Sequence, residues 1–191
     1  CNAAAADARL TTSRLEQLSQ VARIAAQLGG SVLMQHYGRL VTIEQKARAG
    51  DLVTNADLAA EKAVLASLTE ATPEIPVLAE ESGALGDVSD LCWCVDPLDG
   101  TTNFAHGYPF FATSIGLLWR GLPILGAVAV PFLQEVFWCC PVSGAFLNDQ
   151  PIQVSSCSSL DDSLLVTGFA YDRRERLDNN YAEFCRLTHR T

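Results

Sequence analysis

The stretch that most constrains this chain is residues 96–104 (DPLDGTTNF), which follows a short apolar run at 91–95 (LCWCV). The run has the aromatic and β-branched side chains of a buried strand, so we expect it to deliver Asp96 to the strand's end. Pro97 fixes φ and cannot donate to a sheet ladder, so the strand should stop there. The two threonines that follow have the place of helix-capping residues, and the opening N–H groups of such a helix suit an anion. Two carboxylates in one turn beside a helix start indicate a site for metal and phosphate rather than packing.

A second polar stretch, residues 51–57 (DLVTNAD), precedes a helical pattern that Pro73 closes. Thr54 and Asp57 have the spacing of a capping box, in which each side chain bonds the other residue's backbone N–H. From the residues alone, Asp57 is a helix-start carboxylate that complements the helix dipole. This stretch therefore predicts a well-capped helix and no chemistry of its own.

A third stretch places two glutamates directly after an apolar run. Residues 76–79 (PVLA) have the composition of a short buried strand, and Glu80 and Glu81 follow it. Adjacent glutamates usually mark a solvated loop, but here a strand runs straight into them. Glu80, Asp96 and Asp99 thus come from strand ends, and carboxylate oxygens select magnesium or a similar divalent cation over zinc.

Together these stretches resemble the inositol monophosphatase family. The resemblance covers 96–104 with its continuation at 105–110 (AHGYPF), the pattern at 51–57, and residues 80–82 (EES), where Ala79 replaces the family's more usual glycine. Family members are magnesium-dependent, lithium-sensitive phosphatases related to fructose-1,6-bisphosphatase and to the 3′-phosphoadenosine phosphatases. The resemblance implies a phosphoric monoester hydrolase that acts on a small-molecule phosphate ester, with inositol monophosphate as the first choice.

The resemblance also implies site residues, with Mg2+ as the cofactor. The implied catalytic pair is Asp57 and Thr101, hydrogen-bonded to each other and polarising the attacking water. The implied metal ligands are Glu80, Asp96, the Leu98 carbonyl and Asp99, shared between two ions. The implied substrate-binding residues are Glu80, Leu98, Asp99, Gly100, Thr101 and Thr102. Lys46 is by default a solvated loop residue, and by resemblance it is an auxiliary group near the site.

Charge and cysteine usage restrict the partners. The chain has 191 residues and a formal net charge of −9, which argues against a nucleic-acid polymer or an anionic membrane. Its apolar stretches are too broken for a transmembrane helix. An acidic chain suits a phosphate substrate only if cations neutralise the site, as Mg2+ would. The seven cysteines lack zinc-ligand spacing, so we expect free thiols in a reducing compartment, the cytoplasm or an organelle stroma or matrix.

The apolar patterns predict an α+β fold, and the resemblance implies the layered αβαβα arrangement of sugar phosphatases. A helical period over 13–37 opens with a capping-box spacing at Ser13 and Glu16. N-terminal helices should then pack on a largely antiparallel sheet. The expected strands of its meander are 112–119, 125–130 and 135–140.

A further strand at 164–168 and a helix at 181–189 look like the start of an α/β subdomain. The expected domains are a disordered or cloning-derived segment at 1–10, an α+β metal-binding domain at 11–160 and the start of a C-terminal α/β subdomain at 161–191.

The family pattern continues beyond this chain. Members carry a further metal-ligand Asp in a later Trp-Asp motif, and no Trp-Asp occurs here. The resemblance runs from about Leu15 to Thr188 and covers the N-terminal two-thirds of the pattern. We therefore expect a C-terminally incomplete chain with weak or no turnover.

Several functions remain open at this point. Within the phosphatases, fructose-1,6-bisphosphate, histidinol phosphate and 3′-phosphoadenosine phosphate are alternative substrates. A catalytically inert cation-binding protein is a second class, and a purely structural domain is a third. Family members are commonly homodimers, so the resemblance implies a homodimer.

Overall fold

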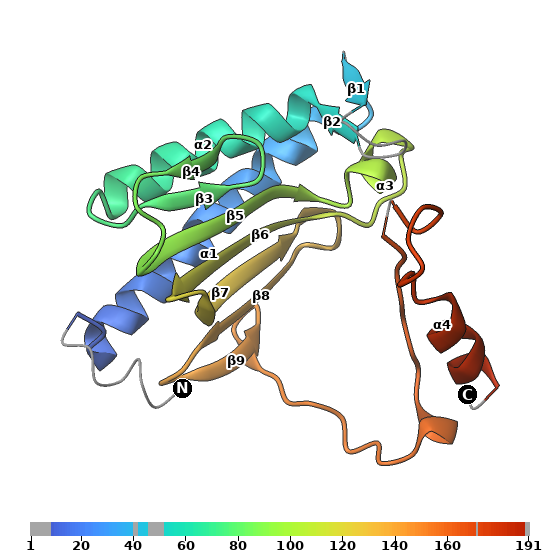
Figure 1. Cartoon of the computed structure of the whole chain (residues 1–191). Helices are drawn as coiled ribbons and strands as arrows, with labels where there is room; N and C mark the ends of the chain where they lie inside the picture. Colours follow the sequence, from blue (N-terminus) through green and yellow to red (C-terminus); the bar gives the residue numbers. More distant parts are fainter. Residues whose placement is uncertain (1–8, 40–41, 46–51, 171, 190–191) are drawn as a thin grey trace. The chain divides into compact units, whose positions relative to one another are not determined.

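The computed structural model describes residues 9–39, 42–45, 52–170 and 172–189. The chain divides into two compact units, one formed by residues 1–44 and 52–152 and the other by 45–51 and 153–191. Figure 1 shows both units coloured along the sequence. Because each unit is a separate body, we describe them one at a time.

The first unit is built on an eight-stranded sheet with the order β10-β9-β8-β7-β6-β5-β3-β4. Every pairing is antiparallel except that of β3 with β5. The expected largely antiparallel sheet is therefore confirmed. The strands are β3 (Val77–Ala79), β4 (Gly83–Leu85), β5 (Leu91–Asp99), β6 (Ala112–Trp119), β7 (Leu122–Val130), β8 (Glu135–Cys140), β9 (Gly144–Leu147) and β10 (Gln150–Pro151). A separate two-stranded sheet joins β1 (Ile43–Gln45) and β2 (Leu52–Thr54).

Two long helices, α1 (Thr12–His36) and α2 (Asn55–Ala71), pack on one face of the sheet (Figure 1). The residues that α1 turns to the strands are small, which brings its backbone close to β6 and β7. Gly29 completes this approach, because a Cβ there would lie 2.7 Å from the Thr113 side chain. Larger side chains from the strands and from α2 fill the remaining space. The core includes Ala22, Ala25, Ala26, Val64, Trp93, Val95, Ile115, Leu117 and Leu125.

The start of α1 corrects one prediction. Thr11 is the N-cap, its backbone is extended, and its hydroxyl accepts a hydrogen bond from the backbone N–H of Arg14 at 3.3 Å. Ser13 already lies inside the helix, so the capping box predicted for Ser13 and Glu16 is wrong. A threonine two residues upstream offers the same hydroxyl chemistry, and spacing alone did not separate the two caps.

The predicted capping box of α2 is confirmed. The Thr54 hydroxyl accepts from the backbone N–H of Ala56, while the Asp57 carboxylate accepts from the backbone N–H of Thr54 at 2.8 Å. The helix ends at Ala71, two residues before Pro73.

The strand before the DPLDGTTNF string is longer than expected. β5 continues through Pro97 to Asp99, although its pairing with β6 is irregular between Asp96 and Asp99. Pro97 therefore interrupts the ladder, as its missing N–H requires, without ending the strand. Pairing resumes between Asp99 and Ala112.

The rest of the meander follows the pattern closely. β6 and β8 have the predicted bounds, whereas β7 begins at Leu122 instead of residue 125. The reason is a tight hairpin: Arg120 and Gly121 both have positive φ, and Trp119 pairs directly with Leu122. Pro123 is tolerated because it sits at a register irregularity opposite Leu118.

The second unit contains a 3-10 turn, η3 (Leu160–Asp162), and one helix, α4 (Tyr181–Thr188). The helix confirms the prediction at 181–189. The strand predicted at 164–168 is wrong, since these described residues have no regular structure and Leu164 is 93% exposed. An apolar run forms a strand only where another strand accepts its backbone hydrogen bonds.

Candidate active site

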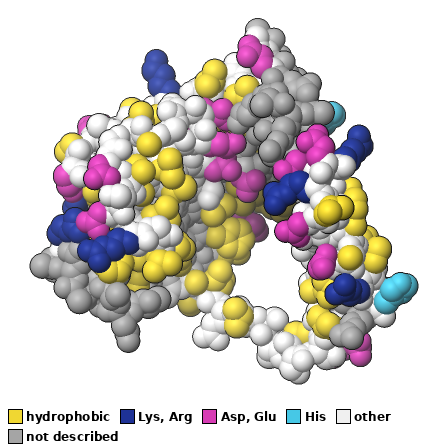
Figure 2. All heavy atoms as spheres, in the orientation of Figure 1, with side chains coloured by type: hydrophobic (Ala, Val, Ile, Leu, Met, Phe, Trp, Pro, Cys, Tyr) yellow, Lys and Arg dark blue, Asp and Glu magenta, His cyan; other side chains and the backbone are white. Residues whose placement is uncertain are grey.

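The parallel pairing of β3 with β5 brings Glu80 and Asp96 together. Leu78 pairs with Cys94, and the backbone N–H of Glu80 donates to the Val95 carbonyl at 3.0 Å, which extends the register by one step. Because side chains alternate across a sheet, Glu80 and Asp96 fall on the same face, away from α1 and α2. Figure 2 shows acidic side chains gathered on this face near the ends of β3 and β5.

The Asp96 carboxyl group is held in a site that disfavours its charge. Burial, the negative charge of Glu80, a hydrogen bond shared with the Glu80 carboxyl group and the charge of Asp99 raise the pKa of Asp96 from 3.8 to about 7. The backbone N–H of Leu98, 3.1 Å from Asp96 Oδ1, acts in the opposite direction but does not offset the other causes. Near neutral pH this pair needs either a proton or a cation.

Two further oxygen ligands could come from Leu98, in the irregular part of β5, and from Asp99, the last residue of the strand. The Asp99 side chain is exposed and close enough to act on the pKa of Asp96. The Leu98 carbonyl oxygen lies 2.9 Å from the Thr101 hydroxyl and shares its single hydrogen with Asp57 Oδ1, which lies 3.3 Å from it. A carbonyl oxygen has a second lone pair, so this bond leaves Leu98 able to bind a cation as well.

Asp57 lies at the start of α2 and is surrounded by donors. Its Oδ2 accepts from the Thr54 hydroxyl at 2.6 Å, and its Oδ1 accepts from the Thr101 hydroxyl at 3.3 Å. Burial raises the pKa of Asp57, although the Thr54 and Thr101 hydrogen bonds act to lower it. The structure thus places the hydrogen bond between the two residues that the resemblance pairs.

A short helix, α3 (Thr101–Ala105), follows directly after the carboxylates. Its N-cap is Gly100, with φ of 90°, and no side chain caps the helix, so the capping role predicted for the two threonines is wrong. The first N–H groups of a helix have no acceptor inside it, so this turn can face an anion. Behind the turn, Phe104 packs against Phe111 and Tyr37, and the Tyr37 hydroxyl donates to the Gly107 carbonyl at 2.6 Å.

The donor set fits a hard divalent cation. Glu80 and Asp96 supply two adjacent carboxylates, while Asp99 and the Leu98 carbonyl supply further oxygens nearby. Within the described part of the chain, no three His, Cys, Asp or Glu side chains are arranged around a single point that could hold an ion. The raised pKa of Asp96 is the observation that favours a cation here. Lys46, predicted as an auxiliary group, lies outside the described residues.

One buried residue near the site was missed by the sequence reasoning. Glu61 is 3% exposed and accepts hydrogen bonds from the backbone N–H of Glu81, at 2.9 Å, and from the Ser82 hydroxyl. It lies one helical turn after Asp57 on α2. Its i, i+4 spacing from Asp57 was the signal that could have identified it.

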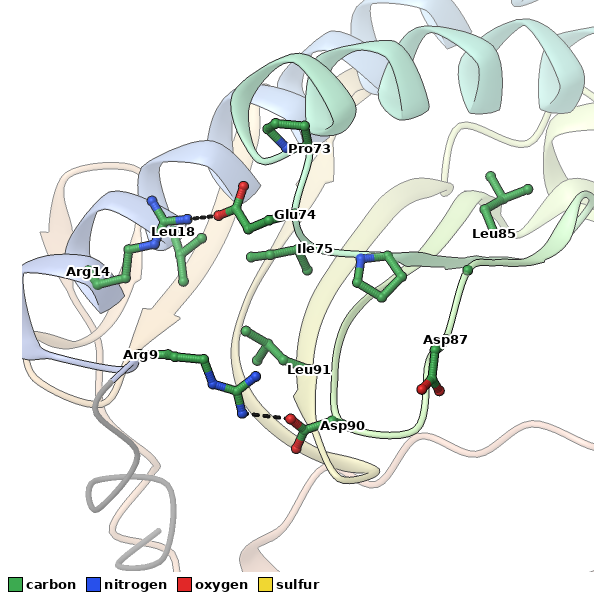
Figure 3. A pocket seen from close by; sticks show the side chains of 12 residues that line it. Arg9, Arg14, Leu18, Pro73, Glu74, Ile75, Leu85, Asp87, Asp90 and Leu91 are labelled. Atoms are coloured by element: carbon green, nitrogen blue, oxygen red, sulfur yellow. Dashed lines mark hydrogen bonds and ion pairs between the residues drawn. The ribbon is translucent and has the colours of Figure 1, made fainter.

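A large cavity lies at the other ends of the same two strands (Figure 3). It has a volume of about 820 Å³, and its lining includes Glu74 and Ile75, which precede β3, and Leu91, the first residue of β5. Its two arginines form ion pairs: Arg9 with Asp90 at 2.6 Å, and Arg14 with Glu74. The carboxylates of the candidate site do not line this cavity and lie toward the opposite ends of β3 and β5.

The described helices include none that is both long and apolar enough to cross a membrane.

Comparison with known proteins matches this geometry to one family. The sequence model described as the inositol monophosphatase family matches residues 14–191. An inositol-1-monophosphatase from Synechocystis is 52% identical over 180 residues, covering 94% of this chain and 63% of that protein. The chloroplastic phosphatase IMPL1 of Arabidopsis thaliana is 39% identical over 90% of this chain and 48% of its own length.

A solved structure shares the fold. The inositol monophosphatase from Anabaena superposes with a TM-score of 0.82 and 47% identity, covering 93% of this chain and 65% of the other. The chain thus spans about half to two thirds of the length of these relatives. Since the family match covers nearly the whole sequence, the chain belongs to the inositol monophosphatase family.

Proposed function

We propose that this protein is a magnesium-dependent phosphomonoesterase of a small polyol phosphate, with inositol monophosphate as the first substrate. The observation that carries the proposal is the adjacent pair Glu80 and Asp96, in which burial, together with the charge and the hydrogen bond of Glu80 and the charge of Asp99, raises the pKa of Asp96 to about 7. Asp96 lies in the last part of β5, after which the chain turns at Gly100 into Thr101, the hydrogen-bond partner of Asp57.

Each group has a distinct task in this proposal. A bound divalent cation supplies charge neutralisation for the phosphate group and lowers the pKa of water. The cation would be bound by the carboxylates of Glu80, Asp96 and Asp99 and by the Leu98 carbonyl. Asp57 accepts from the Thr101 hydroxyl, so the Thr101 oxygen can receive a hydrogen bond from the attacking water and orient it.

The phosphate binds beside these residues. The N–H groups of Gly100, Thr101 and Thr102 open α3 and point toward a phosphate oxygen in this arrangement. Phosphoryl transfer depends mainly on such positioning and charge neutralisation. Lys46 is proposed as an auxiliary group by resemblance alone.

The choice among phosphate esters follows from the relatives. The protein from Synechocystis is named an inositol-1-monophosphatase, and a protein from Aquifex aeolicus, 37% identical, is named fructose-1,6-bisphosphatase/inositol-1-monophosphatase. Histidinol phosphate and 3′-phosphoadenosine phosphate are the other candidate substrates. We further infer a homodimer in a reducing compartment, the cytoplasm or an organelle stroma or matrix. All six described cysteines are free thiols, in keeping with that compartment.

The test is phosphate release by the full-length protein from inositol 1-phosphate, fructose-1,6-bisphosphate, histidinol phosphate and 3′-phosphoadenosine phosphate, with and without Mg2+. We expect Mg2+-dependent release that is fastest with inositol 1-phosphate. Stabilisation by Mg2+ without hydrolysis of any ester would instead identify an inert cation-binding protein. No effect of Mg2+ on stability or turnover would contradict the proposal altogether. The 191-residue chain assayed in parallel should show weak or no turnover.

A further inference from the structure

We propose that Glu61 is a positioning residue that fixes Glu80 against Asp96 and so sets the affinity for the divalent cation. This inference rests on the proposed function, because it assigns a role in the same cation site. Glu61 does not touch the cation in this proposal and acts only through the loop that carries Glu80.

Among the described residues, the hydrogen bonds of Glu61 go to that loop. Its Oε2 accepts from the backbone N–H of Glu81 at 2.9 Å, and its Oε1 accepts from the hydroxyl of Ser82. The side chain is 3% exposed, so water does not compete for these acceptors. A buried carboxylate is costly unless its oxygens are hydrogen-bonded, and here both are.

The loop itself is short and has little freedom. β3 and β4 pair as a hairpin in which Ala79 lies opposite Gly83, so residues 80–82 form the entire connection. On one side of the loop, the backbone N–H of Glu80 donates to the Val95 carbonyl of β5. On the other side, Glu61 holds the next two residues. Glu80 is therefore fixed from both directions, and its side chain is directed to the sheet face that carries Asp96.

The position of Glu61 on α2 links the two parts of the site. Asp57 and Glu61 are four residues apart, so they lie on the same face of the helix, one turn apart. Asp57 bonds Thr101, which follows β5, while Glu61 bonds the loop that follows β3. One rigid helix thus fixes the spacing between the water-orienting pair and the Glu80 ligand.

The chemistry of Glu61 suggests matched variants. In Glu61→Gln, the amide oxygen can accept from the Glu81 N–H, and the amide NH2 can donate to the Ser82 oxygen, so the loop stays held. In Glu61→Met, the side chain keeps its length but offers no comparable acceptor. Ser82→Ala removes the hydrogen bond from the Ser82 hydroxyl to Glu61. Because Ser82 is exposed, we expect this variant to fold. Glu70→Ala is the control, since Glu70 is an exposed glutamate on the same helix.

The experiment uses the full-length protein and measures Mg2+ binding by calorimetry, backbone amide exchange at Glu81 without metal, thermal midpoint, and kcat at saturating Mg2+. We expect Glu61→Met to weaken Mg2+ affinity by about 10–100-fold and to speed Glu81 exchange. At saturating Mg2+ its kcat should recover to within about threefold, because its effect lies in metal affinity. Ser82→Ala should show a smaller loss of affinity, and Glu61→Gln and Glu70→Ala should stay within about threefold of the wild type.

Two results would overturn the inference. The first is a lower thermal midpoint of Glu61→Met with unchanged Mg2+ affinity, which would make Glu61 a purely structural residue. The second is Glu61→Met with wild-type Mg2+ affinity and wild-type exchange at Glu81, which would show that the loop is held by other groups. If the wild-type protein binds no Mg2+ and hydrolyses no ester, the proposed function fails instead, so the two failures are distinguishable.

Discussion

The carboxylates at the start of α2 and those at the ends of β3 and β5 lie beside the same short turn, yet they have opposite surroundings. Asp57 accepts hydrogen bonds from the backbone and hydroxyl of Thr54 and from the Thr101 hydroxyl. Asp96 faces the Glu80 carboxyl group and the charge of Asp99, and one backbone N–H is the donor that opposes them. Burial raises the pKa of both groups. The hydrogen bonds to Asp57 act to lower its pKa, whereas the charges of Glu80 and Asp99 raise the pKa of Asp96 further.

This difference separates two roles that look alike in the sequence. Hydrogen bonds from donors favour the charged form of a carboxylate, so such a group can hold other groups in place without a bound ion. A carboxylate matched with carboxylates is stable only with a proton or a cation. The α2 side therefore serves to orient groups, and the strand-end side serves to hold metal.

The largest expected effect is that of Asp96→Asn, which should separate stability from activity. Loss of a metal carboxylate removes several kcal/mol of charge stabilisation, so kcat/KM should fall by about 10³-fold. Without metal at pH 8, the same change removes repulsion from Glu80 and should stabilise the fold by about 2 kcal/mol, allowing for partial exposure. Phosphate-release assays and urea unfolding of the metal-free protein measure the two effects. A metal-free variant less stable than the wild type would break the comparison.

Asp57→Asn should instead lower both stability and activity. An asparagine side chain has one acceptor oxygen instead of two. Its NH2 group would therefore face at least one of the three donors that now bond Asp57. Loss of the capping box and of buried hydrogen bonds should destabilise the fold by about 2–3 kcal/mol. Urea unfolding in EDTA measures this change. Unchanged stability would show that Asp57 has no orienting role in the fold.

The pH dependence of stability without metal should sharpen the contrast. The folded protein binds a proton at Asp96 more tightly than the unfolded chain does, since the pKa rises from 3.8 to about 7. The protonated Asp96 therefore contributes fully to stability below about pH 4. This contribution falls as the pH rises from about 4 to about 7 and is lost above about pH 7.

The expected loss over that range is about 2 kcal/mol, measured by urea unfolding in EDTA. Saturating Mg2+ or Asp96→Asn should flatten most of it. Asp57 contributes in the same direction because its pKa is also raised. A small residual slope in Asp96→Asn is therefore expected from Asp57, whereas a slope as steep as that of the wild type would contradict the role given to Asp96.

Much of this site follows from short-range sequence signals. The capping box of Thr54 and Asp57, the bounds of β6 and β8, and the helical turn after Gly100 are local patterns, and the structure forms each of them. The family resemblance predicted that Glu80 and Asp96 lie in one site, and the parallel register of β3 with β5 explains why they are adjacent. Their individual roles stay predictions.

The remaining features depend on contacts between distant segments. Glu61 is an ordinary helix glutamate in the sequence, and only the packing of α2 against residues 80–82 gives its carboxylate two partners. The segment 164–168 has the composition of a strand, but no strand of the described residues pairs with it. β5 continues beyond Pro97 because Asp99 pairs with Ala112 of β6. Composition and periodicity carry no information about such partners.

The smallest expected effect concerns the joint between the two groups of carboxylates, Gly100. Its φ of 90° strains any other residue, and a Cβ there would lie 3.1 Å from the Phe110 carbonyl oxygen. Gly107 is the matched control, because its φ is 73° and a Cβ there would meet nothing within 4 Å. Each alanine variant should lose about 1 kcal/mol of stability through backbone strain, measured by urea unfolding.

The contact with Phe110 should make Gly100→Ala the more costly of the two, and it alone should weaken Mg2+ binding, since displacement of the turn moves Asp99 and the Leu98 carbonyl. Equal effects of the two variants on Mg2+ affinity would show that the carboxylates at the strand ends are positioned independently of this turn. In that case β3 and β5 alone would hold the cation, and the link to Thr101 and Asp57 would be only one of proximity.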